Sequence, residues 1–215
     1  MAKIKSFGIE VYVDGDAVGG LTDVSISGTD VSFIDLTTHD SSGEYKEFVG
    51  GLLEGGTLEL TGKFNIEDDG QLALQAGPGD EATFYVIKSD NSGFAFTGII
   101  GGYSTSNPLD DAVEFTATVK ITGLVATVYP TMTVTGTLTD GSDDVGFSPA
   151  DLNGIVDGKP AYGTVVGWSI SGYWIINDID TGAEWRSTSD TLTPDLATGW
   201  TPVSPATGTP TVTGA

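Results

Sequence analysis

The feature that most constrains this chain is a long connection between two segments patterned as β-strands. The strand-like segments are Val31 to Leu36 and Thr57 to Asn65, and the connection runs from Thr37 to Gly56. Connections longer than about 12–15 residues with no structure of their own are uncommon in compact domains, unless they are functional or disordered. We therefore expect either a local structure or a binding partner to order this segment.

Three interpretations of the connection are compatible with its sequence. Its large apolar residues have the spacing of one face of an amphipathic helix. These residues are Tyr45, Phe48, Val49, Leu52 and Leu53. Gly50 and Gly51 oppose a helix, because each glycine inside a helix costs about 1 kcal/mol relative to alanine. The second interpretation is an extended arm whose apolar side chains are buried against another copy of the chain, and the third is a solvated flap.

Most of the remaining sequence is patterned for short strands joined by tight turns. Glycine is abundant, with 31 residues, which favours many turns. Strand-like alternation is found in Lys5–Val13, Leu21–Ser27, Thr57–Asn65, Ala82–Lys88, Phe94–Ser104 and Ala112–Ile121. A short helix is expected at Gln71–Ala76, since acidic residues precede it and Gly77-Pro78-Gly79 ends it. The sequence therefore predicts a mainly β protein, as a sandwich or a barrel with one helix.

The composition changes after Gly123, and this change suggests two domains. All four tryptophans, Trp168, Trp174, Trp185 and Trp200, lie beyond that point. We expect a first domain at residues 1–127 and a small all-β domain at residues 128–215. Its strands are expected at Thr131–Thr137, Gly163–Ile170, Tyr173–Ile176 and Ala206–Val212. The tryptophans, which can each bury about 150–250 Å², are expected to fill its thin core; a surface that stacks on sugars is the alternative.

Charge and composition exclude several classes of function. Acidic residues number 30 against 8 basic ones, and the net charge of -22 opposes binding to nucleic acid or anionic membranes. The absence of cysteine excludes disulfides and cysteine-based zinc sites. No run approaches the roughly 18 apolar residues of a membrane span, so no membrane insertion is expected. The first residues lack the apolar stretch of a signal peptide, and we expect the product to stay in the cytoplasm that makes it.

The sequence contains no convincing catalytic or metal-binding motif. His39 is the only histidine and no Gly-x-Ser-x-Gly motif is present, so we expect His39 to form hydrogen bonds in a turn or an interface. Asp14-Gly15-Asp16 and Asp140–Asp144 offer oxygen ligands for calcium, but neither has EF-hand spacing, and turn formation explains both. We therefore expect no enzyme activity, no metal site and no cofactor.

Several motifs around the long connection resemble a known family. They are Asp35-Leu36-Thr37-Thr38-His39-Asp40, Tyr45-Lys46-Glu47-Phe48-Val49-Gly50-Gly51-Leu52, Glu54-Gly55-Gly56, Leu58-Glu59-Leu60, Glu67-Asp68-Asp69-Gly70-Gln71-Leu72 and Pro108–Lys120. In this order they resemble the major tail tube protein of long-tailed, siphovirus-type bacteriophages, over roughly Ile4 to Gly123. The C-terminal part more weakly resembles a small Trp-rich β decoration module of virion and surface proteins, and we carry no function across from it.

The resemblance implies a tail-tube-type β-sandwich with one short flanking helix and a long inter-subunit loop. Six copies would close into a ring, and rings would stack into a virion tail tube through which the genome reaches the host. Inter-ring contacts would come from Tyr45, Phe48, Val49, Leu52 and Leu53, whereas the residues that line the channel are not identified. A phage, a gene-transfer particle and another injection device are not distinguished.

The same resemblance implies the partners and the location of the protein. The partners are copies of the chain itself, with tape measure, tail terminator and distal tail proteins, and DNA only in transit. The implied location is the virion tail tube, after assembly in the host cytoplasm. An acidic channel wall would repel phosphate and let DNA slide. The alternative function is a surface or secreted adhesion protein that binds carbohydrate through its Trp-rich domain.

Overall fold

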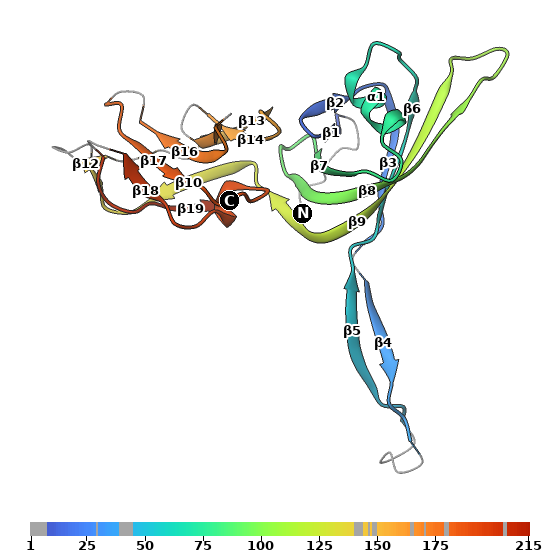
Figure 1. Ribbon diagram of the computed structural model, residues 1–215, viewed down its shortest axis with the longest axis horizontal. Helices are drawn as coiled ribbons and strands as arrows, with labels where there is room; N and C mark the ends of the chain where they lie inside the picture. Colours follow the sequence, from blue (N-terminus) through green and yellow to red (C-terminus); the bar gives the residue numbers. More distant parts are fainter. Residues whose placement is uncertain are drawn as a thin grey trace.

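The computed structural model describes residues 8–28, 30–38, 45–139, 144–145, 147, 150–163, 166–169, 171–178, 181–203 and 206–215. These residues form two large β-sheets, a hairpin that projects away from both sheets, and one α-helix (Figure 1). The predicted mainly β fold with a single short helix is confirmed. Within the described ranges, no helix has the length and apolar character needed to cross a membrane.

The first sheet is antiparallel, has seven strands and curls around its own core. Its strand order is β2-β1-β7-β8-β9-β6-β3. The strands are β1 (Glu10–Val13), β2 (Asp16–Val18), β3 (Leu21–Ile26), β6 (Thr57–Lys63), β7 (Glu81–Ile87), β8 (Gly93–Ser106) and β9 (Glu114–Val128). Alternation along each strand places one row of side chains inside the curl. Leu58, Leu60, Phe84, Phe96 and Phe115 are fully buried there.

Two long strands, β8 and β9, form the centre of this sheet and extend beyond its other strands (Figure 1). The expected end of the last strand at Ile121 is wrong, because β9 continues to Val128. The β8–β9 register shifts between Ala95 and Thr97 and again between Ile100 and Gly102. Such bulges place extra residues in one strand and interrupt the alternation of apolar and polar side chains. The sequence pattern therefore ended before the strand did.

The helix α1 (Asp69–Ala76) covers one opening of the curled sheet. Asp68 caps it, since its carboxylate accepts a hydrogen bond from the Gln71 backbone N–H at 2.9 Å. Leu74 is fully buried in the core of the first sheet. The helix and its end at Gly77 confirm the prediction made from the acidic residues before it and the glycines after it.

The Gln71 side chain joins the helix to two neighbouring loops and is fully buried. Its Nε2 donates to the carbonyl oxygens of Gly19 at 2.8 Å and Lys63 at 3.1 Å, and its Oε1 accepts from the Asn65 backbone N–H at 2.8 Å. The connection between β2 and β3 and the connection between β6 and α1 are thus both held against the helix.

We expect Gln71→Ala to lower the free energy of unfolding by about 2–4 kcal/mol. The substitution leaves buried donors and acceptors without partners, at about 1–3 kcal/mol for each group. Chemical denaturation followed by circular dichroism measures the loss. Gln75→Ala is the matched control, because Gln75 is an exposed residue of the same helix, and it should change stability by less than about 0.5 kcal/mol. Equal effects of the two substitutions would contradict the structural role of Gln71.

The second sheet contains eight short antiparallel strands in the order β18-β17-β16-β15-β14-β13-β10-β19. The strands are β10 (Thr131–Thr135), β13 (Ala150–Val156), β14 (Lys159–Tyr162), β15 (Val166–Ser169), β16 (Tyr173–Asn177), β17 (Glu184–Ser187), β18 (Thr201–Val203) and β19 (Thr211–Gly214). A short pair, β11 (Leu138–Thr139) and β12 (Asp144–Val145), and a 3-10 turn, η1 (Pro194–Leu196), complete this part. The expected strand at Ala206–Val212 is wrong as a single element, because β19 starts only at Thr211.

Three of the four tryptophans occupy the interior of the second part, as predicted, whereas Trp168 is only partly buried. Trp174 and Trp185 are fully buried and Trp200 is 6% exposed. The buried indoles are hydrogen-bonded: Trp174 Nε1 donates to Thr191 Oγ1 at 3.0 Å, and Trp185 Nε1 donates to the Thr207 carbonyl at 3.2 Å. The bulk of these side chains compensates for the small number of residues in each strand.

The two parts share a layer of buried side chains. Tyr85, Ile87, Ala95, Ala126 and Val128 lie on the first sheet but belong to the hydrophobic cluster that contains Trp174 and Trp185. The Tyr85 hydroxyl also donates to the Leu192 carbonyl at 3.2 Å. The second part therefore covers one region of the outer face of the first sheet. The division at residues 127 and 128 into two folding units stays a prediction.

Candidate functional site

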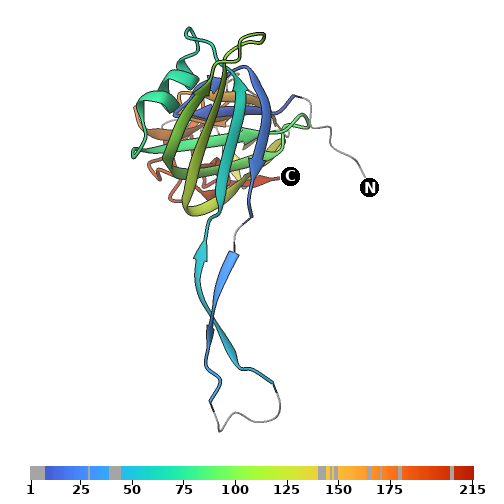
Figure 2. The same cartoon turned by 90° about the vertical axis from the view of Figure 1, so that its right-hand side faces the viewer.

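The long connection of the sequence forms a projecting β-hairpin. β4 (Asp30–Asp35) pairs only with β5 (Phe48–Glu54), and this two-stranded sheet extends away from both larger sheets (Figure 1, Figure 2). We call residues 30–54 the arm. The helix interpretation of this segment is wrong, because Phe48 to Glu54 is a strand. At about 3.3 Å per residue, strands of this length carry the arm roughly 20 Å from the body of the molecule.

The described part of the arm exposes an unusual number of large apolar side chains. They are Phe33, Ile34, Leu36, Tyr45, Phe48, Val49, Leu52 and Leu53. The most exposed are Leu52 at 85% and Tyr45 at 84%. The last five of them were predicted from the sequence, whereas the three in or beside β4 were not. The sequence signal for these residues was the pair of consecutive apolar residues at positions 33 and 34. In a strand that is covered on one side only, apolar and polar residues alternate, so two adjacent apolar residues indicate that both faces are apolar.

The register of the hairpin places apolar residues on both of its faces. Phe48 lies opposite Asp35, and Val49 lies opposite Ile34. Neighbouring residues of a strand point to opposite faces, so Phe48 and Phe33 share one face while Val49 and Ile34 share the other. The two phenylalanine rings meet edge to face with centroids 6.5 Å apart. An isolated two-stranded hairpin is marginal in water, and the described residues leave apolar side chains on both faces of the arm exposed.

Polar interactions hold the two strands together toward the outer end of the arm. The Leu36 N–H donates to the Glu47 carbonyl at 2.8 Å, and the Glu47 N–H donates to Thr37 Oγ1 at 3.0 Å. Asp35 accepts from the Thr37 N–H at 2.9 Å and pairs with Lys46 at 3.5 Å. Hydrogen bonds from Thr37, and secondly the charge of Lys46, lower the pKa of the exposed Asp35 carboxyl. The described outer part of the arm is therefore a defined hairpin.

Close packing fixes the base of the arm. Gly56 has φ +86°, and a Cβ atom there would collide with the Ser27 carbonyl oxygen. A Cβ on Gly55 would lie 2.7 Å from the Ile121 Cγ2 atom. The Ser27 N–H donates to the Thr57 carbonyl at 2.9 Å, while the Thr57 N–H donates to Ser27 Oγ at 2.7 Å. These contacts define the direction in which the arm leaves the first sheet.

The other candidate residues that the structure describes do not form a chemical site. Asp14 lies in the turn between β1 and β2, where its carboxylate accepts from the Thr83 N–H at 2.8 Å. No cluster of three potential metal ligands occurs among the described residues. His39 and residues 140–143 lie outside the described residues. The described carboxylates give no support to a calcium site.

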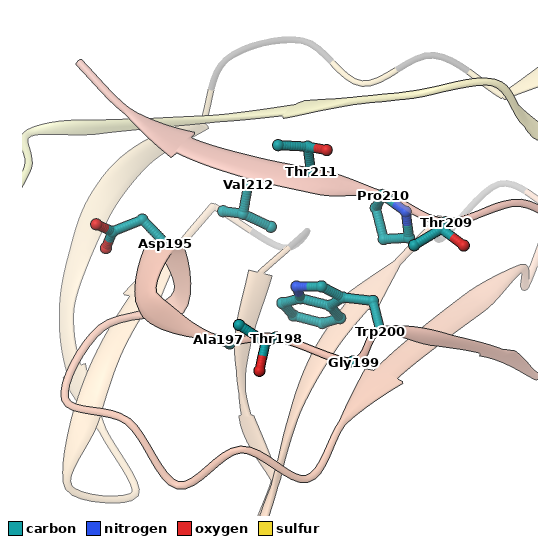
Figure 3. Close-up of a pocket in the computed structure, with 9 residues that line it drawn as sticks. All are labelled: Asp195, Ala197, Thr198, Gly199, Trp200, Thr209, Pro210, Thr211 and Val212. Atoms are coloured by element: carbon teal, nitrogen blue, oxygen red, sulfur yellow. The ribbon is translucent and has the colours of Figure 1, made fainter.

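The second part has a pocket beside one of its tryptophans, which is relevant to the alternative that this part binds carbohydrate. The pocket has a volume of about 260 Å³ and lies beside Trp200, between η1 and β19 (Figure 3). Asp195, Thr198, Thr209 and Thr211 supply its polar groups. A sugar platform needs an open indole face, but Trp200 is only 6% exposed. Trp168 is partly exposed, but the Lys159 ammonium lies over its ring at 4.4 Å and Trp174 packs against it edge to face. The arrangement does not favour a carbohydrate site.

The curled antiparallel sheet, its flanking helix and its projecting hairpin together define the tail-tube fold. The resemblance of the sequence motifs to tail tube proteins agrees with this fold. Comparison with solved structures identifies the particular proteins that this chain resembles.

A chain of the virion of a native gene transfer agent particle is 19% identical; the match covers 59% of this chain and 99% of that chain, with a TM-score of 0.50. A chain from the tail of an empty gene transfer agent particle, refined with C6 symmetry, is 19% identical over 55% and 92%, with a TM-score of 0.46. The SPP1 tail tube is 15% identical over 59% and 79%, also at 0.46. At these identities the likeness shows the fold alone. No protein-family model and no curated protein sequence matches the chain.

Proposed function

We propose that this chain is a structural protein whose copies assemble into the tail tube of a phage or a phage-like particle. The observation that carries the proposal is the arm, a hairpin with apolar residues on both faces that the described part of its own chain leaves uncovered. A large exposed apolar patch marks an interaction site or an aggregation liability. The tail-tube fold makes the neighbouring copies of the same chain its natural partner, and a structural role accords with the expectation that the chain is not an enzyme.

The finer assembly follows the family resemblance. Six copies close into a ring, and the arm of each copy contacts the adjacent ring. Tyr45, Phe48, Val49, Leu52 and Leu53 supply these contacts, together with Phe33, Ile34 and Leu36. Because both faces of the arm are apolar, each arm lies between two surfaces of the adjacent ring. Contacts along the tube axis are heterologous, so stacking is open-ended.

The open face of the first sheet is a suitable wall for the channel. It spans β8, β9, β6 and β3 and is unobstructed in Figure 2. Ser25, Glu59 and Thr118 lie side by side across three of these strands, and Thr61 and Thr116 form the next row. Lys63 and Lys120 lie on the same face, but Glu114 and Glu54 pair with them, so DNA phosphate meets mainly hydroxyl groups, carboxylates and neutralised cations. The second part of the chain then lies outside the tube as a decoration.

In this proposal the protein resides in the virion tail after assembly in the host cytoplasm. Its partners there are tape measure, tail terminator and distal tail proteins, and genome delivery is the task of the finished tube. The protein contributes no catalytic step to delivery.

Electron microscopy of the purified full-length protein tests the proposal. Negative staining should show hollow tubes of open-ended length, and class averages of tube ends should show six-fold symmetry. A protein that stays monomeric at every concentration and salt condition would contradict the proposal. A glycan array on the same preparation tests the carbohydrate alternative, for which we expect no binding.

A further inference from the structure

Two exposed apolar side chains lie at the end of the first sheet opposite the arm. Leu109 is 99% exposed in the connection between β8 and β9, and Ile66 is 72% exposed in the connection between β6 and α1. Both connections project at the end of the molecule that faces away from the arm, in both views (Figure 1, Figure 2). We call residues 64–68 and 107–113 the acceptor end.

The acceptor end is fastened to the body of the protein. Lys63 donates to Asp111 at 3.0 Å and to Glu114 at 2.9 Å, and the Phe64 N–H donates to the Val113 carbonyl at 2.8 Å. The hydrogen bonds that Lys63 donates to Glu114 and Asp111 raise the pKa of its ammonium group. Gln71 holds the other connection through Asn65. Ile66 and Leu109 are therefore carried on anchored segments, which lowers the entropy cost of burying them in a contact.

Both the arm and the acceptor end are acidic. Glu67, Asp69 and Asp110 are exposed acidic residues on or beside the acceptor end, and none of them forms an ion pair within the part of the chain that the structure describes. Lys46 is the only Lys or Arg of the arm and its side chain is 70% exposed. A chain with a net charge of -22 repels its own copies. The arm has six acidic residues, and Lys46 already pairs with Asp35 at 3.5 Å, so apolar contacts and not charge favour binding between the two ends.

We propose that the acceptor end binds the arm of a second copy of this chain. The arm points away from its own acceptor end and projects roughly 20 Å, so it contacts only another molecule. A stack that grows without limit needs two different, complementary surfaces at opposite ends of the subunit. The arm and the acceptor end are the apolar surfaces placed in this way. The inference rests on the proposed function and adds the partner surface of the arm.

The test uses two double variants of the full-length protein. Phe48→Asp/Leu52→Asp disables the arm, and Ile66→Asp/Leu109→Asp disables the acceptor end. Val156→Asp/Leu196→Asp is the control, since it places two acids at exposed apolar positions of the second part. All six positions are exposed, so thermal melting should show folded proteins with wild-type midpoints.

We expect wild type and control to form equal amounts of sedimentable tube, and the acceptor-end variant to form at least about tenfold less. In mixtures, the tagged arm variant should capture the untagged acceptor-end variant at least about threefold better than either variant captures itself, because only the mixed pair retains one intact arm and one intact acceptor end. Wild-type tube yield from the acceptor-end variant would overturn the inference and leave the proposed function standing. Equal capture in all pairs would also overturn it. Absence of wild-type tubes would instead refute the proposed function.

Discussion

Phe48→Asp/Leu52→Asp is expected to yield a folded protein that forms no tubes. Phe48 is 56% exposed and Leu52 is 85% exposed in the single chain, so an acid at either position disturbs little in the subunit. In the assembly each buried side chain of this size contributes about 1.5–3 kcal/mol. Loss of two such contacts from every arm weakens each contact by about 100-fold or more, since 1.4 kcal/mol corresponds to a factor of about 10.

Sedimentation and negative-stain microscopy measure tube formation, and circular dichroism melting confirms the fold. Phe48→Leu/Leu52→Met is the matched control, because it keeps both positions apolar and should assemble at a level close to wild type. Tubes of normal yield from the aspartate variant would refute the role of the arm.

Deletion of residues 130–215 is expected to make the first part insoluble or strongly destabilised. Tyr85, Ile87, Ala95, Ala126 and Val128 are at most 6% exposed, and the second part provides their cover. Uncovering them costs on the order of 5 kcal/mol, from about 1.5–3 kcal/mol for each large side chain. That loss is comparable with the roughly 5–15 kcal/mol that stabilises a typical domain.

A second deletion variant, with polar substitutions on the uncovered face, distinguishes a role of the second part in covering the first sheet from a role in assembly. Adding Ile87→Thr and Val128→Thr to the deletion gives the exposed face hydroxyl groups and keeps β-branched residues in the strands. We expect this variant to be soluble, to melt cooperatively and to form tubes, because the arm and the open sheet face are intact. Failure of this second deletion variant to fold would show that residues 1–127 and 128–215 form one folding unit. A folded variant without tubes would assign the second part to the assembly.

The helix and the strands of the first sheet were readable from the sequence because local signals and tertiary packing agree there. Asp68 and Gly77 bound α1 as their chemistry predicts. β9 is longer than predicted, because extra residues at a bulge interrupt the alternation of apolar and polar side chains that identifies a strand. In the second part, β14 and β17 have four residues each, which gives only two side chains to each face and too short a pattern to detect.

The candidate site was only partly readable for a different reason. Phe48 and Val49, followed by Leu52 and Leu53, fit a helical stripe, yet the same order in a strand places apolar side chains on two faces. Spacing alone could not decide between these structures. Gly51 fits the strand, where a Cβ atom would collide with Ser32. Ile66 and Leu109 have no distinctive sequence context, since only the folded chain shows that they lie exposed at the end opposite the arm.

The tight packing around Gly55 and Gly56 has a mechanical consequence for a stack built through the arm. The direction of the arm relative to the sheet is set by contacts that any side chain at Gly56 would break. The axial rise and the rotation from one ring to the next are then dimensions built into each subunit. A tube of such subunits has the same pitch at every length, so a separate ruler needs to specify only where growth stops.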